Sequence, residues 1–137
     1  GRGDIGVDVG VPATRAGDQI LTSGQLPFVD GALSVTGKVG AEVSAEEAAS
    51  AARVAALNAV ASAADVAGGV DLIRRVVKVV VFVASDPTFS GQPAVANGAS
   101  LLLGEIFGEA GVHVRSAVGV AVLPLDSPVE VELVVEV

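Results

Sequence analysis

Cysteine, tryptophan, tyrosine and methionine are absent from this 137-residue chain, and only four phenylalanines supply aromatic rings. Without cysteine there can be no disulfide, thiol nucleophile or thiolate metal site. The few rings also leave no aromatic platform on which bases or sugars would stack. The single histidine, His113, excludes a histidine-rich metal centre and a catalytic histidine pair.

Positive charge is also scarce, because 8 lysines and arginines face 16 aspartates and glutamates, for a formal net charge of −8. A nucleic-acid binder needs cationic surface to neutralise phosphates, and so does a protein that binds anionic membranes. The first residues, Gly1–Ile5, lack the apolar stretch of a signal peptide. No apolar run approaches the roughly 20 residues of a membrane span. We therefore expect a soluble cytoplasmic protein with no nucleic-acid or membrane partner.

What the chain does contain is alanine, valine and leucine, and 51% of its residues are hydrophobic. The length fits a single domain over residues 1–137. An apolar share this high in a short chain favours extra buried surface at contacts between subunits, although a biased genome composition would also enrich alanine, valine and glycine. Residues 1–17 are glycine-rich without a period, so we predict an irregular N-terminal arm there.

Two helices are predicted. Ser44 and Glu47 form a capping box, in which a serine N-cap is followed three residues later by glutamate. The alanine-rich run after it ends at Gly68 and Gly69, which suit a helix C-terminus. Pro93 fits the first turn of a second helix, which we predict to extend to about Phe107. Gly98 and Gly104 weaken this helix, and we expect them to permit close backbone packing.

Strands are predicted on either side of these helices. An Asp30-Gly31 turn joins two short strands in a hairpin. The valine-rich run Val76–Ala84 is typical of a central strand buried on both faces. In the last strand Glu130 and Glu132 alternate with apolar residues and so point to one face. The predicted strands are 19–23, 33–36, 76–84, 112–123 and 129–137, which gives an α+β fold in the order β-β-α-β-α-β-β.

Few residues in these elements are candidates for chemistry. Arg115 lies in an otherwise apolar strand, where an unpaired charge is costly and must find an anion. Its partner is either a protein carboxylate, such as Glu130 or Glu132 on the next strand, or the carboxylate of a ligand held by a bidentate fork. Spacing alone favours the protein carboxylate. The simplest interpretation of Asn97 and His113 is a local structural role. His113 precedes Arg115 by two residues and so lies on the same strand face.

Six segments resemble the reactive intermediate deaminase (Rid) family, which is also called YjgF-like and labelled endoribonuclease L-PSP. Each is short, but they occur in the family's order and at its spacing from about Gly17 to the end of the chain. The segments are Thr22–Pro27, Val77–Val83, Val95–Asn97, Arg115–Val118, Val122–Pro124 and Val129–Glu132.

The resemblance implies a chorismate-mutase-like fold with two helices on one face of the sheet. It also implies a homotrimer whose sheets form a central β-barrel, with active clefts between adjacent subunits. No metal or organic cofactor is needed in this family.

In the family's deaminases, the arginine at the position of Arg115 binds the carboxylate of a 2-imino acid. The glutamate at the position of Glu130 orients or activates water, so Arg115 and Glu130 are the expected catalytic residues. Ser23, Asn97 and Ala117 match positions that line the cleft. The expected reaction is hydrolytic deamination of 2-imino or enamine acids to 2-keto acids and ammonia.

The chain departs from the family pattern at two positions. The deaminases commonly have a tyrosine in the N-terminal arm, near Gly10 here, and a cysteine where this chain has Ala117. Two other functions stay open for this reason. One is a non-enzymatic trimer that binds a small carboxylate metabolite through Arg115. The other is an endoribonuclease, which the acidic charge, the missing aromatic residues and the single histidine disfavour.

Overall fold

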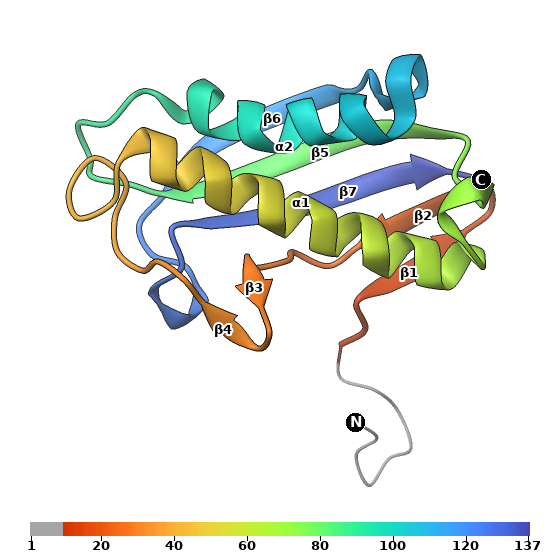
Figure 1. Cartoon of the computed structure of the whole chain (residues 1–137), viewed down its shortest axis with the longest axis horizontal. Helices are drawn as coiled ribbons and strands as arrows, with labels where there is room; N and C mark the ends of the chain where they lie inside the picture. The colour runs from red at the N-terminus through yellow and green to blue at the C-terminus, as the bar shows by residue number, and fades with distance from the viewer. Residues whose placement is uncertain (1–9) are drawn as a thin grey trace, which may run out of the picture.

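The computed structural model describes residues 10–137, which form a five-stranded mixed sheet with two helices on one of its faces (Figure 1). The strand order is β1-β2-β7-β5-β6, and only β5 and β6 run parallel. This confirms the α+β class and the two helices on one face. The helices are α1 (Ala45–Ala67) and α2 (Gln92–Phe107), and the strands are β1 (Ala13–Ala16), β2 (Gln19–Thr22), β3 (Phe28–Val29), β4 (Ala32–Leu33), β5 (Arg75–Ala84), β6 (Val114–Val120) and β7 (Val129–Glu136).

The ends of α1 follow the sequence prediction. The Glu47 backbone N–H donates to the Ser44 side chain at 3.0 Å, and the Glu47 carboxylate accepts from the Ser44 backbone at 3.1 Å. At the other end Gly68 adopts φ 95°, a left-handed conformation that glycine reaches without steric cost. Neither helix of the described chain is long and apolar enough to cross a membrane.

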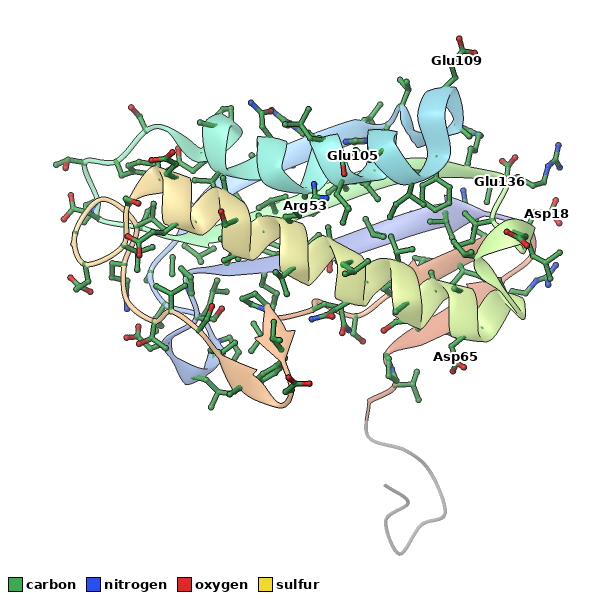
Figure 2. All side chains as sticks on the ribbon, viewed as in Figure 1. Asp18, Arg53, Asp65, Glu105, Glu109 and Glu136 are labelled. Atoms are coloured by element: carbon green, nitrogen blue, oxygen red, sulfur yellow. The ribbon has the colours of Figure 1, made fainter. Side chains whose placement is uncertain are left out.

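Small residues let the two helices approach each other closely. A Cβ atom on Gly98 of α2 would lie 1.9 Å from the Ala49 carbonyl oxygen of α1, so only glycine fits there. A Cβ on Gly104 would meet nothing within 4 Å. The expectation of close packing at these glycines is thus confirmed for Gly98 and wrong for Gly104. On the solvent side the same helix pair is joined by Arg53 and Glu105, whose side chains meet in a two-bond ion pair (Figure 2).

The N-terminal part of the described chain is more regular than the sequence suggested. Ala13–Ala16, inside the predicted irregular arm, forms β1 and pairs with β2 across a turn at Gly17, which has φ 61°. Residues 1–9 of that arm lie outside the described residues. The Asp30-Gly31 turn is confirmed, with φ values of 51° and 80°. Its returning strand β4 ends at Leu33 instead of Thr36.

The sheet has one covered face and one open face. Val79, Val81 and Val83 of β5 are fully buried beneath the helices, whereas Val80 and Phe82 on the other face are only half-buried. The prediction that this strand is buried on both faces is therefore wrong for the single chain, because nothing within residues 10–137 forms a second layer over the helix-free face. The alternation predicted for the last strand is confirmed, since Glu130 and Glu132 lie on that helix-free face.

Candidate functional site

Arg115 lies on β6, at the edge of the sheet, on the same face as the helices. It pairs in register with Val79 of β5, which is buried under α2. Side chains of paired residues in neighbouring strands point to the same face. The guanidinium group therefore reaches α2, and the open edge of the sheet leaves it half-buried.

Three neutral oxygens of α2 hold the guanidinium group. Nη1 donates to the Asn97 Oδ1 atom at 2.8 Å and to the Ser100 Oγ atom at 3.0 Å. Nη2 donates to the Pro93 carbonyl oxygen at 3.4 Å. Asn97 and Ser100 share one helix face because they are three residues apart. No carboxylate within residues 10–137 forms an ion pair with Arg115, so the proposed bridge to Glu130 or Glu132 is not formed here.

A hollow lies further along the same strand face, and Arg115 is not among the residues that line it. Ala117 and Gly119 follow Arg115 at two-residue steps, so their Cα atoms present the same side of β6. Beyond them the ends of β5 and β6 and the start of α2 enclose about 290 Å³. A Cβ on Gly119 would lie 3.0 Å from both the Gln92 Nε2 and the Ser85 Oγ atoms, so glycine leaves this space open.

Glu130 lies on the opposite face of the sheet. It pairs with Phe82 on β5, which faces away from the helices. The backbone at Gly24 passes directly over it, because a Cβ there would lie 2.5 Å from the Glu130 carboxyl carbon. Gln25 fixes this approach through two backbone hydrogen bonds with Val131, at 2.7 and 3.0 Å.

The environment of Glu130 favours its protonated form. Burial beside the Gly24 segment raises the pKa of Glu130, and the nearby negative charge of Glu132 raises it further. A carboxyl group with a raised pKa holds a proton more readily than an ordinary glutamate and can both accept and return one. This is the kind of perturbation expected at functional sites, although ion clusters elsewhere in proteins also produce it.

Ser23 precedes Gly24, whose backbone passes over Glu130, and its own side chain bonds to the chain before β1. Its hydroxyl donates to the Val11 carbonyl oxygen at 2.6 Å, and its backbone N–H donates to Pro12 at 2.7 Å. These bonds tie the chain before β1 to the end of β2. The bonds between Gln25 and Val131 hold the same segment against β7.

The predicted site residues thus form two groups. Asn97 and Arg115 are bonded to each other, with Ala117 next on the same face, whereas Ser23 and Glu130 lie with the other face. Ser100 was not predicted from the sequence, although its three-residue spacing from Asn97 on a predicted helix was a usable signal. Gly24, which allows the backbone to pass over Glu130, gave no such signal.

Within residues 10–137, no three histidine, aspartate or glutamate side chains converge as metal ligands would.

Comparison with known proteins decides the family. The family model described as "YjgF/chorismate mutase-like, putative endoribonuclease" matches residues 6–137. This chain belongs to the YjgF-like family. The resemblance carried by the six sequence segments is therefore confirmed.

Individual proteins are similar to this chain over most of its length. Protein TCP17 of Trypanosoma cruzi is 47% identical over 122 residues, which cover 88% of this chain and 76% of that protein. The crystal structure of Atu1372 from Agrobacterium tumefaciens, a protein of unknown function, is 42% identical with a TM-score of 0.92, covering 96% of this chain and 84% of its own. E. coli TdcF with bound serine shares the fold at 23% identity and a TM-score of 0.65, covering 96% of this chain and 90% of its own.

Proposed function

We propose that this protein hydrolyses reactive 2-imino acids, and their enamine tautomers, to 2-keto acids and ammonia. The observation that carries the proposal is the set of contacts made by the Arg115 guanidinium group. Its guanidinium group is held in place by neutral oxygens of α2, with no carboxylate of the described chain to neutralise it. A fixed cation of this kind at an open sheet edge suits an anionic ligand.

The ligand's carboxylate is the natural partner of this group. Arginine binds both carboxylate oxygens in one plane, which also orients the rest of the ligand. TdcF, which has the same fold, holds serine, a small molecule that carries a carboxylate. Asn97 supports the site by orienting the guanidinium group, and Ala117 lies beside it on β6.

Glu130 supplies the acid–base chemistry. The imine carbon is already electrophilic, so the reaction needs an oriented water and a group that moves protons. The Glu130 carboxylate accepts a proton as the water oxygen bonds to the imine carbon, and it returns that proton to nitrogen, which gives a carbinolamine. The hydroxyl group of the carbinolamine then loses its proton, which is also transferred to nitrogen, as the keto C=O forms. The C–N bond breaks and ammonia leaves the 2-keto acid.

Arg115 and Glu130 act together only if two copies of the chain build each site. They lie on opposite faces of one sheet, with β5 between their strands. We propose a homotrimer in which helix-free faces form a central barrel and clefts open between neighbours. The helix-free face of β6 supports this arrangement, since Val114 and Val118 are 65% and 43% exposed in the single chain.

A coupled assay tests the activity. A serine or threonine dehydratase generates the imino acid, and its decay is followed with and without this protein. We expect the protein to accelerate the decay, and Arg115→Ala to abolish the acceleration while the oligomer remains intact. An Arg115→Ala variant that falls apart into monomers would instead make Arg115 a structural residue.

Two other outcomes would redirect the proposal. A protein that binds 2-keto acids but leaves every small imino acid unchanged would be a metabolite-binding trimer without enzyme activity. RNA cleavage that survives nuclease-free repurification and disappears in Arg115→Ala would support the endoribonuclease function. The acidic composition of the chain, with a net charge of −8, argues against RNA cleavage because an RNA-binding surface needs positive charge.

A further inference from the structure

The Ser100 hydroxyl connects Arg115 to the only histidine of the chain. Ser100 Oγ lies 3.0 Å from the Arg115 Nη1 atom and 2.8 Å from the His113 Nε2 atom. The other ring nitrogen of His113, Nδ1, lies 2.6 Å from the Gly111 carbonyl oxygen. Three side chains, from α2, from β6 and from the residue just before β6, thus form one continuous hydrogen-bonded chain.

Only one arrangement of protons satisfies every bond of this chain with a neutral imidazole. The Gly111 carbonyl can only accept, so His113 carries its proton on Nδ1 and its Nε2 atom is an acceptor. The Ser100 hydroxyl then donates to Nε2. Its oxygen accepts from Arg115, because a guanidinium group can only donate. The direction of donation therefore leads from the arginine to the Gly111 backbone.

This chain determines which donors of Arg115 are left for a ligand. A guanidinium group has five N–H donors, and Nη1 uses both of its own on Asn97 and Ser100. Nη2 uses one on Pro93. The donors that remain within the described contacts are one Nη2–H and the Nε–H, and the Nη2 and Nε atoms share one edge of the planar group. Two neighbouring N–H groups match the two oxygens of a carboxylate.

We propose that Ser100 and His113 are positioning residues that present this edge of Arg115 to the substrate's carboxylate. The proposal rests on the proposed function for the identity of the ligand, but not for the geometry. Ser100 alone would be free to rotate its hydroxyl. His113, anchored on the Gly111 backbone, directs that hydroxyl away from Arg115, so that the oxygen faces the guanidinium group.

Nitrogen-15 NMR of the full-length protein tests the geometry without any ligand. Because the chain has one histidine, the imidazole gives a single set of signals that needs no assignment. We expect neutral His113 to be protonated on Nδ1, and the Nε2 signal to move in Arg115→Ala. A neutral ring protonated on Nε2, or a signal unaffected by Arg115→Ala, would overturn the proposal.

Ligand affinity tests the positioning role. We expect Ser100→Ala to weaken the binding of pyruvate roughly tenfold, the scale of one hydrogen bond to a charged group. Ser100→Thr keeps a hydroxyl and should bind nearly as the parent protein does. His113→Leu should weaken binding, and His113→Gln, which places an amide oxygen near the Nε2 position, should partly restore it. Ser62→Ala on α1 is the matched control and should change nothing.

The kinetic pattern separates positioning from folding. In the imine assay we expect Ser100→Ala to raise KM more than it lowers kcat, because carboxylate binding is affected and Glu130 is not. Unchanged pyruvate affinity in both Ser100→Ala and His113→Leu would overturn the proposal. Failure of the parent protein to bind pyruvate would count against the proposed function instead, while the imidazole signals would still decide the hydrogen-bonded chain.

Discussion

Arg115 and Glu130 lie on opposite faces of one sheet, on strands that are both paired with β5. Arg115 is bonded to α2 on the covered face, whereas Glu130 lies beneath the Gly24 backbone on the helix-free face. A small substrate cannot contact both within one chain. The proposed chemistry therefore requires that the β6 edge of one copy, which carries Arg115, lies beside Glu130 of another copy.

Replacement of Glu130 tests its catalytic role. Glu130→Gln keeps the shape of the side chain and removes its ability to accept a proton. We expect kcat for imine hydrolysis to fall by about 10²–10⁴, the usual contribution of general acid–base catalysis. Pyruvate binding, measured by calorimetry, should be retained because Arg115 is untouched. Unchanged turnover in this variant would remove Glu130 from the mechanism.

The pH dependence of the reaction tests the electrostatics around Glu130. The pKa of Glu130 is raised by burial and by the charge of Glu132. Activity that needs the carboxylate should therefore fall, as pH decreases, at a higher pH than an ordinary glutamate would give. Glu132→Gln removes the neighbouring negative charge and lowers this pKa, so the acid limb of the kcat profile should move to lower pH. A shift to higher pH, or none, would contradict the assignment.

A pair of glycines in α2 tests the packing between the helices. A Cβ at Gly98 would overlap the Ala49 carbonyl at 1.9 Å, so Gly98→Ala must separate the helices. We expect it to lower the free energy of unfolding by about 1–3 kcal/mol, the usual cost of overpacking. Gly104→Ala meets no neighbour and should raise it by about 1 kcal/mol through helix propensity alone. Urea denaturation of both variants checks the difference, and equal effects would contradict this packing.

A charge on the helix-free face tests the proposed assembly. Val114 is 65% exposed in the single chain, and the trimer would bury it. Val114→Glu should dissociate the oligomer and abolish imine hydrolysis, because the charge would be buried without a partner. Leu57→Glu, on an exposed position of α1, is the matched control and should leave both unchanged. Sedimentation velocity measures the outcome, and an intact Val114→Glu oligomer would place the interface elsewhere.

Most of the fold follows from local sequence signals. The capping box at Ser44 and Glu47, the left-handed turn at Asp30-Gly31 and the alternation after Val129 each depend on a few adjacent residues, and each is confirmed. Strand β1 was missed because Ala13–Ala16 has little β propensity of its own and is stabilised by pairing with β2. Such pairing is a tertiary effect that the local composition does not reveal.

The candidate site was less accessible from the sequence. Arg115 stood out as a charge in an apolar strand, and the roles of Arg115 and Asn97 came from the family resemblance. Their direct bond came only from the structure. That Arg115 and Glu130 occupy opposite faces depends on the register of β5 with both of its neighbours, which no local pattern specifies. Ser100 was missed because its role depends on a contact between α2 and β6.

The most direct test of this account is activity restored by mixing two inactive variants. Arg115→Ala and Glu130→Gln copies, co-expressed and shown by native mass spectrometry to form mixed oligomers, should recover imine hydrolysis, because some clefts receive both intact residues from different copies. Random mixing should restore about a quarter of the sites in a symmetric ring. Mixtures of Arg115→Ala with the double variant should stay inactive. Mixed oligomers of the two single variants that remain as inactive as their parents would contradict a site shared between subunits.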